Sequence, residues 1–168
     1  MNATSSPAPI LIGVETPFDA RAIDQVVLRA FGPGRYAKTA ERLRERSRPV
    51  AGFVAREGGR VIGSVRLWPI TIGAHPALFL GPIAVERAER SAGVGAMLVE
   101  ACLEWSRDQG VCGVLLVGDP PYFSRFGFRS VHGPVMPGPV DPARLMWWGE
   151  GEVPCGLVSV PSPAGPGA

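Results

Sequence analysis

Two glycines and an arginine lie where an apolar run gives way to a helical pattern, and these residue types suit the binding of a phosphate group. They fall in residues 80–96, LGPIAVERAERSAGVGA. The first N–H groups of a helix have no partners within it, and the helix dipole is positive at this end. Gly93 and Gly95 would let a diphosphate approach the backbone closely, and Arg90 adds a positive charge. The spacing predicts an anion site, although a tight turn before a helix would use glycines in the same way.

Two well-known phosphate loops do not fit this stretch. The run GVGAML at residues 93–98 lacks the third glycine of the dinucleotide-binding fingerprint, and no Gly-Lys-Ser/Thr follows as a P-loop requires. A nucleotide or phosphate binder of another kind, using the same helix start, stays as an alternative.

Two segments resemble the landmarks of one enzyme family. The run RSAGVGA at residues 90–96, preceded by GPIAV at 81–85, resembles the Arg/Gln-x-x-Gly-x-Gly/Ala motif of the GNAT superfamily of N-acetyltransferases. The run VGDPPYFSRFGF at 117–128 resembles the second landmark of that family, an aromatic residue shortly before Gly-Phe. The pair is most similar to the bacterial YhbS-like branch, and the likeness extends over about residues 50–130. Two landmarks at this separation are more specific than either alone.

The resemblance implies that acetyl-CoA is the co-substrate and lies where two strands of a splayed sheet part. The backbone of Ile83, Ala84 and Val85 would pair with the pantetheine arm. The N–H of Val85 would polarise the thioester carbonyl and stabilise the tetrahedral oxyanion. The diphosphate would be bound by the glycine loop, namely Arg90, Ser91, Ala92, Gly93, Val94, Gly95 and Ala96. The amine would attack the thioester directly, so neither an acyl-enzyme nucleophile nor a metal is expected.

The general acid and base are less clearly marked. Many family members place a tyrosine four residues before the Gly of Gly-Phe, and the count back from Gly127 arrives at Phe123. Tyr122 is one residue earlier and is the candidate for protonating the leaving thiolate; the alternative is a packed or substrate-contacting tyrosine. Glu86, just beyond Val85, could act as a general base through a water or be a solvated loop carboxylate.

The other reactive side chains fit no constellation. The three cysteines, Cys102, Cys112 and Cys155, are odd in number and form no CxxC pair, so neither a disulfide framework nor a metal site is expected. Cys102 and Cys112 fit the role of small buried apolar residues. His75 and His132 each lie beside Pro or Gly in an expected turn.

The elements that must position these residues follow from hydrophobic periodicity. One helix is expected to start at the Thr16-Pro17 signature and end before the glycines at 32–34, a second covers 36–48, and a third runs from 94 to Gly110. Strands are expected over residues 10–14, 50–56, 60–67, 77–85, 111–117, 145–148 and 153–160. The fold class is therefore mixed α+β. The resemblance implies a GNAT fold with a central, largely antiparallel, splayed sheet of about seven strands flanked by helices.

Composition limits the class of protein and its partners. The chain has 168 residues, 46% hydrophobic and 19% charged, with a net charge of +2. This balance predicts one globular domain over 10–160 with loose tails at 1–9 and 161–168, and it does not indicate a nucleic-acid partner. The N-terminus lacks the features of a signal peptide, and no apolar run approaches the ~18 residues of a membrane span. We expect a soluble cytoplasmic protein without a membrane partner.

Two further functions stay open once the resemblance is considered. The resemblance implies an N-acetyltransferase that acts on a small-molecule or protein amine. The alternative is a non-catalytic acyl-CoA binder or sensor that kept the cofactor groove, because Phe123 stands where the acid is usual. The acceptor and the acyl chain length are not readable, although Phe31, Tyr36, Trp68 and Trp147 could shape the acceptor side. The apolar C-terminal third could join the sheet of a second copy to form a homodimer.

Overall fold

Residues 6–32 and 39–162 are described by the structure, a computed structural model, with the side chains of Arg90 and Ser91 outside that description. The predicted tails fall largely outside these ranges. The tails and the single domain at 10–160 therefore stay predictions.

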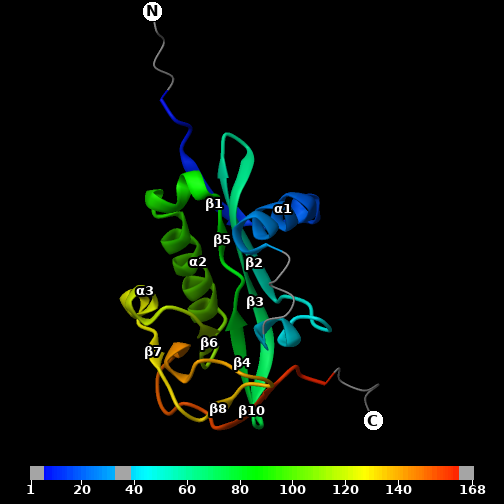
Figure 1. Cartoon of the computed structure of the whole chain (residues 1–168), viewed down its shortest axis with the longest axis vertical. Coiled ribbons are helices and arrows are strands. Elements are labelled where there is room, and N and C mark those ends of the chain that lie inside the picture. Colours follow the sequence, from blue (N-terminus) through cyan, green and yellow to red (C-terminus); the bar gives the residue numbers. More distant parts are fainter. Residues whose placement is uncertain (1–5, 33–38, 163–168) are drawn as a thin grey trace, which may run out of the picture.

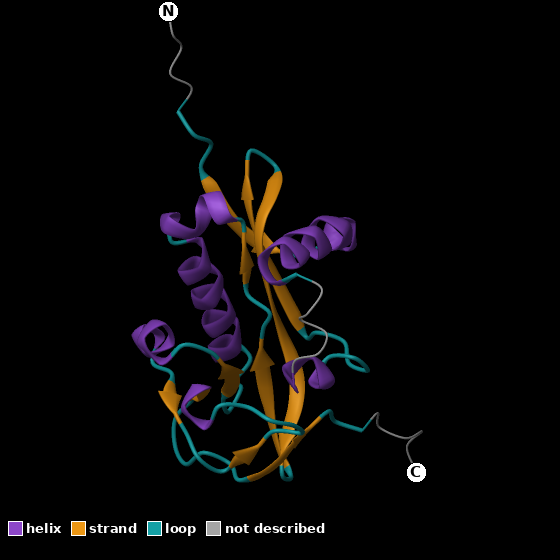
Figure 2. Cartoon of the chain, viewed as in Figure 1, coloured by secondary structure: helices purple, strands orange, loops and turns teal. Residues whose placement is uncertain are grey.

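The strands of the described residues form one mostly antiparallel sheet (Figures 1 and 2). Its main path runs β1-β2-β3-β4-β6-β9-β7, with β5 and β10 also paired to β3, and β8 paired to β10. Only the β4–β6 and β8–β10 pairs are parallel. The mixed α+β class is confirmed, with ten strands in place of about seven. The strands are β1 Ile10–Val14, β2 Ala51–Glu57, β3 Arg60–Ile72, β4 His75–Leu80, β5 Ala84–Val85, β6 Val114–Val117, β7 Arg129–Ser130, β8 Pro134–Val135, β9 Leu145–Trp148 and β10 Gly156–Ser159.

Two long helices cover opposite faces of the sheet (Figure 1). Helix α1, Ala20–Phe31, packs on Val54 and Val61, whereas α2, Val94–Asp108, packs on Ala55 and Ile62. Neighbouring residues of a strand point to opposite faces, so the one-residue step between these pairs places the helices on different sides. The sheet therefore has a core on each face, and each helix is fixed by burial of its apolar stripe.

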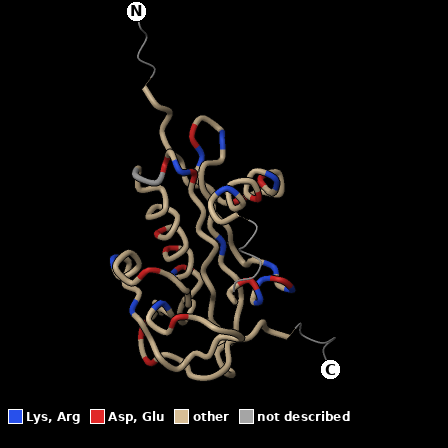
Figure 3. Tube along the Cα trace, in the orientation of Figure 1, with Lys and Arg blue, Asp and Glu red and all other residues tan. Residues whose placement is uncertain are grey.

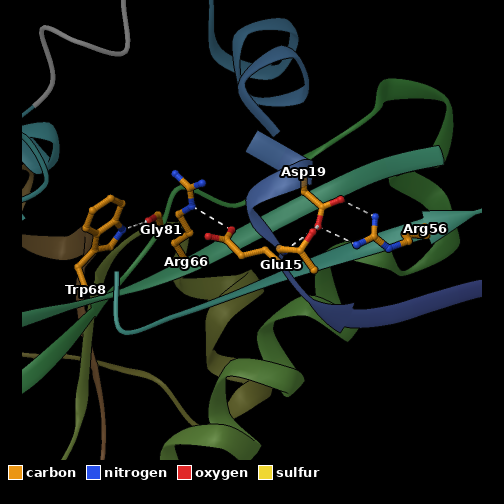
Figure 4. A network of polar contacts seen from close by, with 7 residues as sticks. Glu15, Asp19, Arg56, Arg66, Trp68 and Gly81 are labelled. Atoms are coloured by element: carbon orange, nitrogen blue, oxygen red, sulfur yellow. Dashed lines mark hydrogen bonds and ion pairs between the residues drawn. The ribbon is translucent and has the colours of Figure 1, made fainter. Parts of the chain in front are cut away.

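A short segment before α1 attaches that helix to the sheet. Thr16 and Asp19 form the predicted capping box around the turn η1, Pro17–Asp19. The Asp19 carboxylate also accepts two hydrogen bonds from Arg56 on β2, at 2.7 and 2.8 Å (Figure 4). These hydrogen bonds and the ion pair hold the pKa of Asp19 well below its usual range. The buried carboxylate thus joins the start of α1 to the second strand.

The ends of several strands differ from those expected from the sequence. The single strand expected over 77–85 is two, β4 and β5, because the chain leaves its pairing with β3 at Gly81-Pro82. Strand β3 continues past Leu67 to Ile72, since Ile70 and Ile72 are buried even though Pro69 lies between them and Leu67. The expected last strand shortens to β10, and the strand expected from residue 111 begins at Val114.

The helix expected over 36–48 is also wrong in its described part. The chain there forms only a 3-10 turn, η3 Thr39–Leu43, followed by turns. Within η3 only Thr39 and Leu43 are buried, and so few packed side chains do not support a longer helix. Residues 36–38 lie outside the described residues.

Candidate active site

The sheet opens between β4–β5 and β6. Strand β4 pairs with β6 only through Leu78 to Val114 and Phe79 to Leu115. Beyond Gly81-Pro82 the chain pairs again with β3, as β4 does, but no longer with β6, and Val85 stands opposite Gly63. The two strands that lie side by side at Phe79 therefore separate, as a splayed sheet requires.

The backbone of β5 presents polar groups to this opening. The N–H of Glu86 donates to Ile62 O on β3 at 2.8 Å. Successive residues of a strand direct their N–H and C=O groups to opposite edges, so those of Ile83 and Val85 are directed away from β3. The side chain of Ala84 is buried beside α1. An extended ligand chain could thus pair with alternate backbone groups of this segment.

The glycine loop lies beside the opening, where α2 begins. Gly93, the N-cap residue, has φ +74°, a conformation that favours glycine, and a Cβ built there would meet nothing within 4 Å. Gly93, Gly95 and Ala96 line a cavity of about 510 Å³ together with Ile83 and Val85. Ala92 is exposed, whereas the Val94 side chain is buried in the core, so only the backbone of Val94 could contact a ligand. The structure places the predicted loop against the predicted strand.

A second cavity of about 600 Å³ continues from the first. Phe31, Ile83 and Phe123 line both cavities, so the two meet at the opening of the sheet. Phe79 and Leu116 give the second cavity an apolar wall. Its charged lining residues come from other segments, namely Arg44, Asp119, Asp141 and Arg144. A long molecule in the first cavity and a small one in the second would meet beside Ile83.

Tyr122 and Phe123 lie on α3, Pro120–Phe123, across the opening from β5. A Cβ built on Gly95 would lie 2.8 Å from Tyr122 Oη and 3.9 Å from Val85 Cγ2, so the phenol points at the glycine loop near Val85. Burial raises the pKa of Tyr122, and the phenol therefore keeps its proton at neutral pH. The Phe123 ring contacts Gly118 and lines the junction of the cavities without a hydroxyl group.

The two carboxylates near the opening differ in their surroundings. Glu86 ion-pairs with Arg29 of α1 at 2.6 Å and is not among the described residues that line either cavity. Asp119, at the N-cap position of α3, lines the larger cavity, and its side chain accepts no hydrogen bond from the helix amides. We did not expect Asp119 from the sequence, because an Asp before Pro-Pro after a buried strand looks like an ordinary helix cap.

The aromatic residues expected on the acceptor side mostly lie elsewhere. Phe31 lines both cavities, but Trp147 is buried in the core on β9. Trp68 is also buried and donates from Nε1 to Gly81 O at 2.6 Å, which fixes the start of the segment leading to β5 (Figure 4). Tyr36 lies outside the described residues.

The cysteines do not supply a nucleophile at this opening. Burial raises the pKa of Cys102, as its expected core position on α2 implies. Cys112 is exposed rather than buried, because β6 begins only at Val114.

Within residues 6–32 and 39–162 no group of three or more His, Cys, Asp or Glu could hold a metal ion. No helix in these ranges has the length and apolar character needed to cross a bilayer.

Comparison with known proteins places these features in a family. The profile described as Acetyltransferase (GNAT) family matches residues 20–128. A protein of Escherichia coli (strain K12), "Uncharacterized N-acetyltransferase YhbS", is 36% identical over 123 residues, which cover 71% of this chain and 74% of the relative.

Two crystal structures resemble this one over nearly the whole chain. The GNAT family N-acetyltransferase YhbS from Escherichia coli in complex with CoA superposes with a TM-score of 0.77 at 29% identity, covering 94% of this chain and 92% of that chain. A GNAT family acetyltransferase from Brucella melitensis in complex with acetyl-CoA gives 0.71 at 28% identity, with 92% and 97% covered.

Proposed function

Because this chain belongs to the GNAT family of acetyltransferases, we propose that it transfers an acetyl group from acetyl-CoA to an amine by direct attack on the thioester. The observation that carries the proposal is the pair of cavities that meet at Ile83, where the sheet opens. One cavity lies against the glycine loop and the other against side chains of mixed charge. This arrangement suits a cofactor and an acceptor that approach from two directions.

The cofactor is placed by backbone groups. Its pantetheine arm pairs with Ile83, Ala84 and Val85, whose alternate N–H and C=O groups are directed to the opening. Its diphosphate lies at the start of α2, where the loop of Arg90, Ser91, Ala92, Gly93, Val94, Gly95 and Ala96 supplies amides and the helix dipole adds a favourable field. The two relatives above bind CoA and acetyl-CoA, which supports this choice of ligand.

Arg125 adds a charge from the α3 side of the same cavity. Its guanidinium lies 4.6 Å from the centre of the Tyr122 ring, and its Nε donates to Tyr122 O at 3.3 Å. Arg125 and the glycines line one cavity. The cofactor phosphates would therefore lie between the amides at the start of α2 on one side and the Arg125 guanidinium on the other.

The transfer begins when the neutral amine attacks the thioester carbonyl, and the oxyanion that forms is stabilised by the backbone N–H at Val85. The intermediate then collapses and expels the CoA thiolate, which Tyr122 protonates. Two observations support this role: the phenol points to the region of Val85, and its raised pKa keeps the proton on it. The proton lost by the amine passes to a carboxylate through water. Asp119 suits this better than Glu86, because Asp119 lines the cavity and Glu86 is paired with Arg29.

Ligand-dependent thermal stability tests the cofactor site directly. Acetyl-CoA and CoA should raise the unfolding midpoint of the wild type by mass action, and ATP should not. Gly93→Glu should abolish the shift, because it puts a carboxylate at the diphosphate. Gly59→Glu is the matched control: Gly59 also has positive φ and open space around it, but lies in the β2–β3 turn. No shift with CoA, or loss of the shift in both variants alike, would contradict the site.

A non-catalytic acyl-CoA sensor is the second candidate, and Phe123 favours it. Its ring stands at the junction of the cavities without a hydroxyl. A sensor would bind acetyl-CoA yet form no acetylated product with any amine in a broad panel. Product formation that falls by about 10²-fold in Tyr122→Phe would exclude it. The cytoplasmic location and the homodimer stay predictions.

A further inference from the structure

We infer that the acceptor is a small amino acid, a molecule that carries a free carboxylate close to its attacking amine. This rests on the proposed acetyl transfer and concerns the larger cavity. Two arginines, Arg44 and Arg144, line that cavity from separate segments, and most of its other lining residues are apolar.

Arg44 is held at the end nearest the cofactor. Its guanidinium lies 5.5 Å from the centre of the Phe79 ring, and its Nη1 ion-pairs with Glu41 at 3.2 Å. Its Nη2 would be 2.7 Å from a Cβ built on Gly81, so it lies directly over that glycine. Gly81 lies two residues before Ile83, so this charge lies over the chain just ahead of the segment that leads to β5.

Arg144 closes the cavity from the other side. It ends the turn η6, Pro142–Arg144, and its Nε donates to Gly118 O at 3.3 Å. This contact leaves the terminal nitrogens for another acceptor group. No carboxylate of the described residues lies within ion-pair distance of Arg144. A planar guanidinium with two parallel N–H groups matches a carboxylate in shape as well as charge.

The acidic groups of this cavity are accounted for differently. Asp141 accepts a hydrogen bond from Ala143 N at 3.0 Å, within its own turn, and Glu41, which pairs with Arg44, does not line this cavity. Asp119 lies after β6, beside the junction with the cofactor cavity. The cavity thus offers the Asp119 carboxylate to an arriving ammonium group and the Arg144 guanidinium to a carboxylate. Phe79, Leu116 and Val140 leave room for an apolar side chain between them.

The test compares matched acceptors that differ only in the carboxylate. Initial rates of N-acetyl product, measured by mass spectrometry, are compared for leucine with 3-methylbutylamine and leucinamide, and for phenylalanine with phenethylamine and phenylalaninamide. We expect kcat/KM to favour the amino acids by about 10- to 100-fold, the scale of a charge-assisted hydrogen-bonded pair. Equal rates, or preference for the amines or amides, would overturn the inference while leaving acetyl transfer intact.

Arg144→Gln tests the proposed partner of the carboxylate. The KM for the amino acid should rise about 10-fold or more with kcat nearly unchanged, whereas the KM for acetyl-CoA and for the plain amines should not move. Arg129→Gln is the matched control, because Arg129 also donates to a backbone carbonyl, Gly151 O at 3.2 Å, but lines neither cavity. The same rise in both variants, or none in Arg144→Gln, would contradict the assignment.

Failure of the inference can be told from failure of the proposed function. If acetyl-CoA stabilises the protein and no amino acid in a wider panel is acetylated or shifts the midpoint of the acetyl-CoA complex, the carboxylate assignment is wrong. If acetyl-CoA itself gives no shift, the cofactor assignment fails first.

Discussion

The proposed cofactor side and the proposed acceptor side of the opening are built in different ways. The cofactor side is mainly one continuous stretch from Ile83 to Ala96, to which Tyr122 and Arg125 are added from the α3 side, and we propose that it acts mainly through backbone groups. The acceptor side is assembled from side chains of η3, the end of β6 and the turn η6. A backbone site depends on chain conformation and tolerates many side chains, whereas a side-chain site changes its chemistry with each substitution.

The two sides are also fixed by different forces. Val94 and Leu98 of α2 are fully buried, so the start of that helix is held by the core. The acceptor side is joined across the chain by polar contacts: Thr39 Oγ1 donates to Pro139 O, and Arg42 donates to Pro137 O, both at 2.6 Å. Figure 3 shows basic and acidic residues interspersed along the chain, without segregation into one basic segment. The proposed cofactor side would therefore bind a cofactor through backbone groups that most sequences can supply. The proposed acceptor side would select its substrate through particular side chains.

The largest effect is expected from filling the cofactor side. Gly95→Leu puts a side chain where even an added Cβ would lie 2.8 Å from Tyr122 Oη, so acetyl-CoA affinity should fall by about 100-fold or more. Isothermal titration measures it. Gly13→Leu, at an open position on the edge strand β1, should bind normally. Unchanged affinity in Gly95→Leu would mean that the cofactor does not lie on this side.

The next effect concerns the chemistry between the two sides. Tyr122→Phe should lower kcat by about 10²-fold with little change in acetyl-CoA affinity, because it removes the proton donor and keeps the ring. Since burial raises the pKa of Tyr122 above its usual value near 10, no alkaline loss of rate from its ionisation is expected below about pH 10. A fall in affinity with kcat unchanged would make Tyr122 a binding residue. Rescue of kcat by adding Phe123→Tyr would place the effective hydroxyl at the junction.

Asp119→Asn probes the acceptor side and should lower kcat about 10-fold near neutral pH, with a smaller loss at high pH, where more of the amine is already neutral. Glu86→Gln, which removes the ion pair with Arg29, is the comparison variant and should change kcat less. The reverse ranking in steady-state rates would return the role of the base to Glu86.

Arg125→Gln should weaken acetyl-CoA binding by about 5-fold at low salt and less at high salt, because exposed charge pairs are screened. Arg107→Gln is a suitable control, since Arg107 also stacks on an aromatic ring, Trp148, but lines neither cavity. Titrations at two ionic strengths make the measurement. Equal effects in both variants would show general charge loss rather than a phosphate contact.

The smallest effect on the reaction is expected at the far end of α1. Asp19→Asn should lower the free energy of unfolding by about 1–3 kcal/mol at pH 7 and leave turnover nearly unchanged. The folded-state pKa of Asp19 is lowered, so its stabilisation is present above about pH 4 and is lost as the pH falls further. Denaturant unfolding should show a smaller difference between the two proteins at pH 3 than at pH 7, because part of the stabilisation is lost over this range. A constant difference would mean that the carboxylate charge is not the cause.

The sequence alone determined the parts that are local. The glycine loop, the helix that follows it and the capping box at Thr16 each depend on residues a few positions apart, and the structure places all three where the sequence predicts them. The motifs that resemble the family can be recognised in the sequence for the same reason. A site that binds phosphate through backbone amides requires particular residues within one short segment.

Only the tertiary structure decided the acceptor side. Asp119 and Arg144 are ordinary turn residues in the sequence, and they become cavity residues because β6 and β9 pair and bring residues 118 and 144 into contact. Likewise, the helix expected over 36–48 is only the 3-10 turn η3 in its described part. Glu86 forms an ion pair with Arg29, which belongs to the distant helix α1. Contacts between residues far apart in the chain depend on the packing of whole elements, and no local pattern records them.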